Sequence, residues 1–371
     1  MSQFEVRVYK LTILPHPNAD KIELAQIGDF LSVVGKDQFR SGDLGAYIPE
    51  ASVLPLEIIQ ELGVEGKLSG SSKNRVRAAR LRGVLSQGLV LPARKGWKEG
   101  DDVAEELGIK KYEPKLPANM RGKAVGVDQD ITVNYDIENI KKHNQIFSEE
   151  EAEVVAMTEK IHGTFVQFGY IPLGVSDPAK LYLGAFTVTS KGLGGRGILL
   201  DHYDMNNVYT KMAQRPDYGL YAKLVAIRAE YLSIFGQDSP VYLCGEIFGP
   251  GVQVGFDYGV PAGEEEFRVF DIAFGKRSVL QYLPFYLVEK ICQDYEIPMV
   301  PVLYRGRFSK EALEKTTTGS ETVSGKGVHM REGVVVKPYH QERRETRAGR
   351  CILKSVSPAY LLRKGEVTEY Q

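Results

Sequence analysis

The sequence predicts an α+β protein with two domains, a small β-barrel followed by a larger domain in which strands alternate with helices. Three observations predict this arrangement. The chain has 371 residues, which is enough to build two hydrophobic cores. Residues 1–110 carry short runs of β-branched and aromatic residues separated by turn-forming groups. From about residue 131 onward, strand patterns alternate with segments of helical spacing.

The N-terminal domain is expected to consist of short strands. They are placed at residues 4–14, 22–27, 31–34, 44–48 and 85–92. The segments 16–21 and 36–43 are rich in turn-forming residues and supply the longer connections. About five strands in such a span are typical of an OB-like barrel, a fold that often presents one face to nucleic acid.

A linker is expected between the domains. Residues 95–106 are charged and turn-rich, and residues 114–121 contain two prolines with little periodicity. We therefore divide the chain into an OB-like nucleic-acid-binding domain (1–112), a linker (113–128) and a second domain (129–371).

The charge of the chain is nearly balanced but unevenly distributed. A net charge of −1 excludes a protein that binds nucleic acid through bulk positive charge. Residues 73–98, however, contain no Asp or Glu. The candidate phosphate contacts in this basic run are Lys73, Arg75, Arg77, Arg80 and Arg82. Their two-residue spacing would place neighbouring arginines on one side of a strand. A solvated surface without a partner is the alternative.

The composition favours an intracellular protein. Cys244, Cys292 and Cys351 are widely separated, so neither a disulfide framework nor a zinc site is expected. No segment has the apolar length of a signal peptide or of a membrane span. We expect a cytoplasmic monomer that has no membrane partner.

The second domain repeatedly places charged residues at the ends of apolar strands. Helices are expected at 221–235 and 279–295, and the strand ends carry Lys160, Glu246, Lys337 and Lys354. Lysines and carboxylates in such positions are typical of a site for a polyphosphate and a divalent metal. Lys160 ends an apolar strand, where partial desolvation would favour a neutral, nucleophilic amine.

The order of these segments resembles that of covalent nucleotidyltransferases, and specifically of ATP-dependent RNA ligases of the RNA ligase 2-like branch. The matching motifs are Glu159-Lys160-Ile161-His162-Gly163, Ser190-Lys191-Gly192, Gly245-Glu246, Val269-Phe270-Asp271, Glu332-Gly333-Val334-Val335-Val336-Lys337 and Leu353-Lys354-Ser355. Residues 16–22 are similar to the opening turn of OB-type tRNA-binding domains. An N-terminal OB domain on such a catalytic domain resembles the RNA ligase 5 type. The resemblance implies an ATP-grasp-like nucleotidyltransferase domain of antiparallel sheets with flanking helices.

The resemblance also implies roles for individual residues. Lys160 would take AMP from ATP as a phosphoramidate, and the AMP would pass to a 5′-phosphate end before a 3′-hydroxyl displaces it. Phe270 would stack on adenine, and Glu159 would place the adenine edge through its backbone. The remaining implied residues are Glu332 and Glu246 as metal or ribose contacts, Lys191, Lys337 and Lys354 as nucleotide contacts, and His162 at the phosphate-end steps. The implied cofactors are ATP and Mg²⁺ or Mn²⁺, and the implied partner is RNA, as nicked RNA or an RNA/DNA duplex with an RNA 3′-hydroxyl.

One position departs from the pattern of these enzymes. Their last motif is usually Lys-x-Lys, but Ile352 stands at its first position here, and Arg350 is the candidate to replace the missing charge. Two other functions stay open: a non-catalytic RNA-binding protein of the OB type, and a DNA ligase or capping-type nucleotidyltransferase. DNA ligases and capping enzymes usually carry a further domain after the last motif, whereas about 17 residues follow that motif here.

Overall fold

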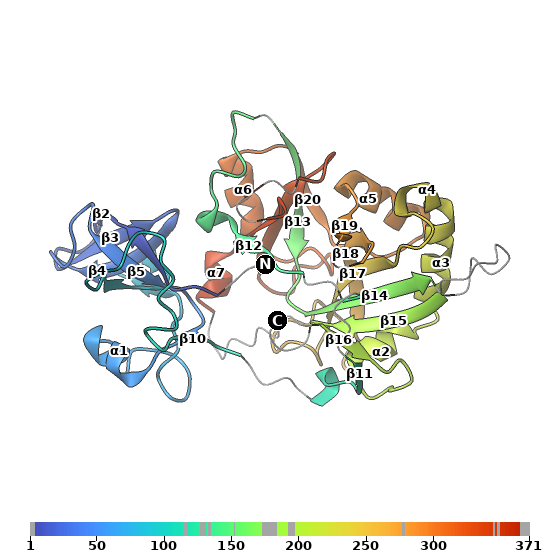
Figure 1. Ribbon diagram of the computed structural model, residues 1–371, viewed down its shortest axis with the longest axis horizontal. Coiled ribbons are helices and arrows are strands. Elements are labelled where there is room, and N and C mark those ends of the chain that lie inside the picture. The colour runs from blue at the N-terminus through green and yellow to red at the C-terminus, as the bar shows by residue number, and fades with distance from the viewer. Residues whose placement is uncertain are drawn as a thin grey trace.

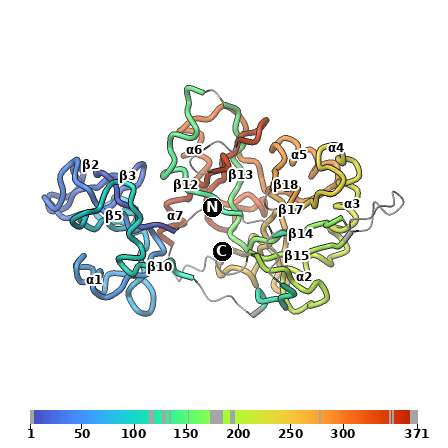
Figure 2. The backbone as a smooth tube through the Cα atoms, viewed as in Figure 1, coloured from blue at the N-terminus to red at the C-terminus, as the bar shows by residue number. Residues whose placement is uncertain are grey.

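The computed structural model has two parts that lie side by side, with the N-terminal part at one end of the molecule (Figure 1). It describes residues 4–113, 118–126, 131–132, 135–151, 153–172, 184–191, 197–276, 279–343, 346 and 349–363. The N-terminal part consists mainly of strands, and the larger part combines sheets with helices (Figure 2). The predicted α+β class with a β-rich N-terminal domain is therefore confirmed.

Two small antiparallel sheets form most of the N-terminal part. One contains β1 (Arg7–Lys10), β5 (Leu44–Ile48) and β9 (Leu89–Pro92), and the other β2 (Thr12–Pro15), β3 (Ile22–Ile27) and β4 (Phe30–Gly35). The expected strand 85–92 is interrupted by Gly88, which has a φ of +69°. A Cβ there would lie 2.5 Å from the Tyr47 ring, so this close approach requires glycine.

Several short N-terminal elements were not predicted. They are β6 (Ser52–Val53), α1 (Leu56–Glu61), β7 (Ala79–Leu81) and β10 (Lys110–Lys111), whereas β8 (Val84–Ser86) overlaps the start of the expected strand 85–92. The helix α1 begins after Pro55 and buries Ile58 and Ile59 against the domain core. Elements of two to six residues give too few repeats for a periodic signal.

The larger part contains two sheets. The larger sheet runs in the order β11 (Ala124–Gly126), β16 (Ile198–Leu200), β15 (Gly184–Ser190), β14 (Thr164–Pro172), β17 (Val241–Phe248), β18 (Glu266–Phe274) and β19 (Gln281–Tyr282). The smaller sheet runs in the order β12 (Glu138–Asn139), β22 (Leu353–Val356), β21 (Gly333–Pro338), β13 (Val154–Lys160) and β20 (Val302–Arg307). Among these described strands, β12 and β22 pair in parallel and the other neighbours are antiparallel.

Helices flank the two sheets, as expected. They are α2 (Val208–Ala213), α3 (Leu220–Glu230), α4 (Leu232–Phe235), α5 (Phe285–Asp294), α6 (Lys310–Thr317) and α7 (Pro358–Leu361), with 3₁₀ turns at Ala118–Met120 and Ile140–Lys142. The expected helix 221–235 is divided at Tyr231 into α3 and α4. The expected helix 279–295 is wrong before Pro284, because proline favours the N-terminal boundary of a helix over its interior.

The chain crosses from one sheet to the other directly after Lys160. The strand β13 belongs to the smaller sheet and β14 to the larger one, and the connection is only residues 161–163. A hydrophobic cluster that includes Phe165, Cys244, Val335 and Ile352 lies between the sheets. The two sheets therefore meet where the predicted nucleophile is placed.

The residue boundaries of the domains stay a prediction. Within the expected linker 113–128, the described strand β11 pairs with β16 of the larger sheet. The three cysteines are buried and form no disulfide with one another.

Candidate active site between the two sheets

A pocket opens between the two sheets and brings most of the predicted site residues together. Its lining residues are Tyr135, Asp136, Ile137, Thr158, Glu159, Lys160, Ile161, Phe165, Lys191, Glu246, Phe270, Val300, Val335, Lys337 and Lys354. The predicted nucleotide contacts Lys191, Glu246, Phe270 and Lys337 thus share one cavity with Lys160, although they come from separate parts of the chain. Such convergence of charged groups in a partly apolar pocket is typical of a small-molecule site.

Lys160 and Glu332 form the ion pair at the edge of this pocket. The Nζ of Lys160 lies 2.5 Å from Oε1 of Glu332, whose side chain is only 2% exposed. Backbone pairing aligns them, because Lys160 of β13 is opposite Gly333 of β21. A Cβ on Gly333 would lie 2.0 Å from the Ser355 carbonyl oxygen, so glycine allows β21 and β22 to approach at this point.

The residue Gly163 brings Glu246 close to Lys160. A Cβ on Gly163 would lie 2.2 Å from the Ile247 carbonyl oxygen and 2.8 Å from Cγ of Glu246. The side chain of Gln253 also donates a hydrogen bond to the Gly163 carbonyl at 2.8 Å. The absence of a side chain at position 163 therefore allows the backbone to pass close to β17 where it crosses from one sheet to the other.

Glu246 is held mainly in its neutral form. Desolvation raises the pKa of its carboxyl to about 8; the positive charge of Lys160 opposes this shift and the negative charge of Glu332 adds to it. A carboxyl that shares a pocket with a second carboxylate and with a lysine would ionise when a cation binds nearby.

His162 lies beside the pocket and does not line it. Its side chain is 5% exposed, and its Nδ1 is 3.7 Å from Oε2 of Glu332. Its backbone N–H donates to the Tyr258 hydroxyl at 2.6 Å. Burial is the largest cause that lowers the pKa of His162 well below its usual value, with Arg363 and Lys160 adding to the effect. The ring is therefore neutral at pH 7.

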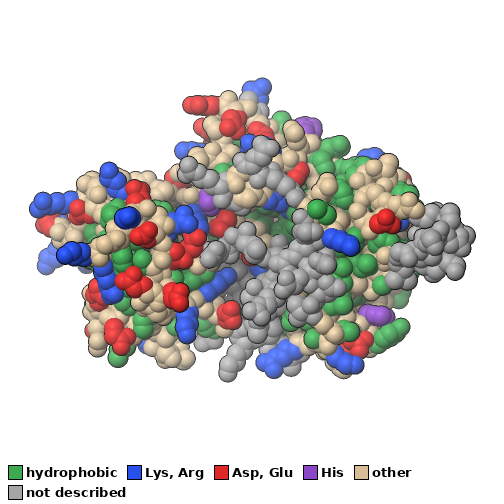
Figure 3. Space-filling model, viewed as in Figure 1, with side chains coloured by type: hydrophobic (Ala, Val, Ile, Leu, Met, Phe, Trp, Pro, Cys, Tyr) green, Lys and Arg blue, Asp and Glu red, His purple; other side chains and the backbone are tan. Residues whose placement is uncertain are grey.

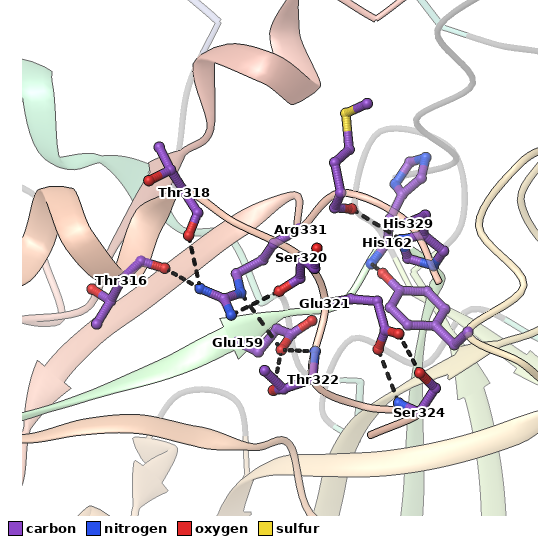
Figure 4. Close-up of polar contacts among 12 residues, drawn as sticks. Glu159, His162, Thr316, Thr318, Ser320, Glu321, Thr322, Ser324, His329 and Arg331 are labelled. Atoms are coloured by element: carbon purple, nitrogen blue, oxygen red, sulfur yellow. Dashed lines mark hydrogen bonds and ion pairs between the residues drawn. The ribbon is translucent and has the colours of Figure 1, made fainter. Parts of the chain in front are cut away.

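The side chain of Glu159 is directed away from Lys160, toward the loop that precedes β21. Figure 4 shows its carboxylate next to Thr322 and Arg331. Oε2 accepts hydrogen bonds from the backbone N–H and the hydroxyl of Thr322 at 2.9 and 2.5 Å, and Nε of Arg331 is 3.6 Å away. Arg331 in turn donates to backbone carbonyls, including that of Thr316 at 2.5 Å. Glu159 thus ties the 318–331 loop to the end of β13.

Aromatic rings form one wall of the pocket. The rings of Phe270 and Tyr135 have centroids 4.8 Å apart, and Tyr135 also stacks on Phe165 at 5.9 Å. The Tyr135 hydroxyl donates to Asp271 at 2.6 Å. This contact fixes Tyr135 beside Phe270, so the wall is built from β14, β18 and the segment before β12.

The lysines predicted to contact the nucleotide lie at different depths. Lys337 is 4% exposed, and its Nζ donates to the Phe270 carbonyl at 2.9 Å. Burial lowers the pKa of Lys337 to about 8. Lys191 pairs with Asp136 at 2.8 Å. Lys354 is half-buried on β22, opposite Val335 of β21.

The structure does not support Arg350 as the replacement for the lysine that is missing at position 352. Its guanidinium pairs with Asp271 at 2.6 Å and with Glu342 at 2.5 Å, and it is absent from the pocket lining. Ile352 is 3% exposed and fills the hydrophobic cluster between the sheets. The structure therefore does not support the expected role of Arg350, because two carboxylates already pair with its guanidinium.

Several pocket residues were missed by sequence reasoning. Tyr135, Asp136 and Ile137 line the pocket because the next residues form β12 and pair with β22. Nothing local in this polar segment indicates a site. Thr158 and Val335 lie in strands that were recognised, and their position two residues from Lys160 and Lys337 could have indicated a shared face.

The predicted phosphate contacts of the N-terminal part divide into two groups. Lys73, Arg80 and Arg82 are exposed, the last two on the hairpin of β7 and β8. Arg75 is 5% exposed, and its guanidinium lies 4.2 Å from the centre of the Tyr112 ring, so the structure does not support a phosphate contact there. Arg77 donates to the Arg363 carbonyl at 2.8 Å. Acidic side chains lie among the basic ones on the face of this domain seen in Figure 3.

Within the described residues, no three His, Cys, Asp or Glu side chains converge to hold a metal by themselves. Among the described helices, none combines the length and apolar composition needed to cross a membrane.

Comparison with known families identifies the larger part. The family model described as RNA ligase matches residues 153–356, which run from the start of β13 to the end of β22. The chain belongs to the RNA ligase family. A second model, described as an OB-fold domain, matches residues 6–93. This RNA ligase family member therefore combines an N-terminal OB fold with the catalytic domain, as predicted.

Solved structures of Naegleria gruberi RNA ligase share this fold. One, a mutant solved with AMP and Mn, has a TM-score of 0.73 at 24% identity and covers 96% of this chain and 97% of that chain. Another, solved with PPi, also has a TM-score of 0.73 at 24% identity and covers 97% and 98% of the two chains. Both domains and their order are thus shared along nearly the whole length.

Proposed function

We propose that this RNA ligase family member joins 5′-phosphate and 3′-hydroxyl ends of RNA at the expense of ATP, through AMP bound to Lys160. The observation that carries the proposal is the position of Lys160. Lys160 is the last residue of β13 and lies at the edge of a pocket that is lined by aromatic and cationic side chains. Its Nζ is 2.5 Å from Oε1 of Glu332. Enzymes that transfer phosphoryl groups act mainly by such positioning and by neutralising charge.

The first step would form a bond between Nζ of Lys160 and the α-phosphorus of ATP. The bond from that phosphorus to the bridging oxygen breaks, and pyrophosphate leaves with the bonding electrons. The ammonium must lose a proton before it attacks, and the Glu332 carboxylate is the acceptor nearest to it. In the next steps a 5′-phosphate oxygen displaces Lys160, and a 3′-hydroxyl oxygen then displaces AMP.

The pocket suits a purine nucleotide. Phe270 would offer a π-face to adenine, with Tyr135 and Phe165 behind it. Lys191, Lys337 and Lys354 would contact the phosphates. Glu159 would contribute through its backbone, since its carboxylate contacts Thr322. A Naegleria gruberi RNA ligase structure of the same fold was solved with ATP and Mn, which supports ATP as the nucleotide.

The residues present fit a divalent metal such as Mg²⁺ or Mn²⁺. Glu246 lines the pocket and Glu332 pairs with Lys160 at its edge, while the described residues hold no complete protein cage. Mg²⁺ is usually bound by one or two carboxylates together with substrate phosphates. When bound, the metal would neutralise phosphate charge. Glu246, with its raised pKa, would give up its proton as the metal arrives.

For the substrate, we propose a nick in a duplex with an RNA 3′-hydroxyl strand, gripped in part by the exposed arginines of the OB fold. The OB-fold match and the RNA ligase match support an RNA substrate. The monomeric state and the intracellular location stay predictions.

The proposal is tested by incubating the full chain with ATP labelled at the α-phosphate and a divalent metal, without nucleic acid. Wild-type protein should become labelled, and Lys160→Ala should abolish labelling. Lys315→Ala, an exposed lysine on α6, is the matched control. If the wild type stays unlabelled, the covalent mechanism is wrong and a non-catalytic RNA-binding role is favoured.

A second assay distinguishes the substrates. Nicked duplexes that differ only in the sugar of the 3′-hydroxyl nucleotide are offered to the labelled enzyme. Faster sealing with ribose supports the RNA proposal, whereas equal rates with deoxyribose would favour a DNA ligase.

A further inference from the structure

The ring of His162 is enclosed by aromatic side chains. It meets Phe256 edge to face with centroids 4.7 Å apart and Tyr360 with centroids 5.2 Å apart. Its backbone is held by Tyr258. Such packing fixes the plane of the ring, and the hydrogen bonds to its nitrogens decide which of the two carries the proton.

The Tyr360 hydroxyl is the group that contacts these nitrogens. It lies 3.1 Å from Nδ1 of His162 and 3.4 Å from Nε2. Tyr360 is completely buried. A neutral imidazole has one donor and one acceptor nitrogen, and a phenol can serve either of them.

The position of Tyr360 is linked to Glu332 by the backbone. Tyr360 lies on α7, and Ser357 at the start of this helix donates its N–H to the Glu332 carbonyl at 2.8 Å. The Arg363 guanidinium covers the Tyr360 ring at 3.5 Å and donates to the Tyr360 carbonyl at 2.8 Å. The hydroxyl is therefore set by the same backbone that carries the partner of Lys160.

We propose that Tyr360 is a positioning residue for lysine adenylylation, which acts by holding the His162 ring against the Glu332 carboxylate. His162 is 3.7 Å from Oε2 of Glu332, and Oε1 of the same carboxylate holds Lys160 at 2.5 Å. A buried chain of contacts thus runs from Tyr360 through His162 to Glu332, and it ends at the nucleophile Lys160. This inference rests on the proposed function of Lys160.

The test is a double-mutant cycle on the full chain with Tyr360→Phe, His162→Asn and the two combined. The rate of label transfer from α-labelled ATP is measured in a single turnover at saturating ATP. Tyr360→Phe should slow labelling about 3- to 10-fold, the rate equivalent of one neutral hydrogen bond. In the His162→Asn background the same change should have less than about a twofold effect, because its target is gone. The ATP concentration for half-maximal rate should not change, since Tyr360 does not line the pocket.

Controls separate the possible failures. Tyr218→Phe removes another buried hydroxyl, which bonds to Glu266, and should keep the full rate. If neither the wild type nor this control is labelled, the proposed function fails. If both are labelled and Tyr360→Phe equals them, or slows the reaction equally in both backgrounds, Tyr360 does not act through His162. Melting curves of all variants establish that they fold, and His162→Gln replaces His162→Asn if the latter does not.

Discussion

Glu246 carries a carboxyl whose surroundings favour the protonated form. Its pKa is about 8 in the folded chain, against 4.5 as the usual value. Between these pH values the folded state binds more protons than the unfolded state, so stability falls as pH rises from about 4.5 to about 8. Above that range the loss is complete. In the ligand-free protein, ionisation of Glu246 therefore lowers the free energy of unfolding as the pH rises.

Replacing Glu246 with glutamine should remove this pH dependence. In EDTA and without ATP, the Tm of Glu246→Gln minus that of the wild type should increase between pH 5 and pH 8.5. The expected increase is at least about 2 °C, the equivalent of roughly 1 kcal/mol in a chain of this size. Glu314→Gln, on the exposed side of α6, is the control. A constant difference across this range would show that Glu246 is not desolvated.

Phe270 should determine how tightly the adenine base is held. Its ring lies beside Tyr135 at 4.8 Å and lines the pocket. Phe270→Leu keeps an apolar side chain but removes the π-face, so the KM for ATP in self-adenylylation should rise. Stacking worth roughly 1–3 kcal/mol corresponds to about a 5- to 150-fold change. Phe235→Leu, a buried phenylalanine of α4 outside the pocket lining, is the control, and an unchanged KM in Phe270→Leu would contradict the stacking role.

The connection between β13 and β14 joins the two halves of the site. A Cβ on Gly163 would clash with the Ile247 carbonyl at 2.2 Å, and that carbonyl belongs to rigid backbone of β17. Gly163→Ala should therefore separate Lys160 from Glu246 and slow self-adenylylation roughly 100-fold, the cost expected for a displacement of about 1 Å. Gly126→Ala, where a Cβ meets no atom within 4 Å, should keep the wild-type rate. Wild-type labelling by Gly163→Ala would show that the strands can separate without loss.

The sequence predicted the site residues that follow apolar strand patterns. It did not predict the site residues that reach the pocket through long-range packing. Lys160 and Glu246 were found because a charged residue after an apolar run is conspicuous in one dimension, although β17 continues past Glu246 to Phe248. Tyr135 and Tyr360 were not found, since one reaches the pocket through the parallel pairing of β12 with β22 and the other through packing of the short helix α7. The ion pair of Arg350 with Asp271 was not foreseen either, because Asp271 is distant in the sequence.

At the scale of the whole molecule, the OB fold is attached to the catalytic domain by polar contacts. Lys141 donates to Gln87 at 2.6 Å, and its carbonyl accepts the Asp29 N–H at 3.1 Å. Arg77 donates to the carbonyl of Arg363 at 2.8 Å, beside the helix that carries Tyr360. Polar interfaces of this kind are typical of domains that can move relative to each other. Arg77 therefore acts between the domains, which leaves the exposed hairpin arginines as the phosphate contacts to test.

The double variant Arg80→Ala/Arg82→Ala should weaken nick binding without affecting the first chemical step. Both side chains are exposed on the β7–β8 hairpin, distant in sequence from Lys160. Each lost phosphate contact should reduce the slope of log K against log salt by about 0.9, so two contacts should reduce it by roughly 2. Binding of a nicked duplex is measured between low and moderate salt, and self-adenylylation is measured in parallel. Arg40→Ala, exposed in the same domain but outside the basic run, should leave the slope unchanged. An unchanged slope in the double variant would mean that the hairpin is only a solvated surface, and that RNA is gripped by the catalytic domain.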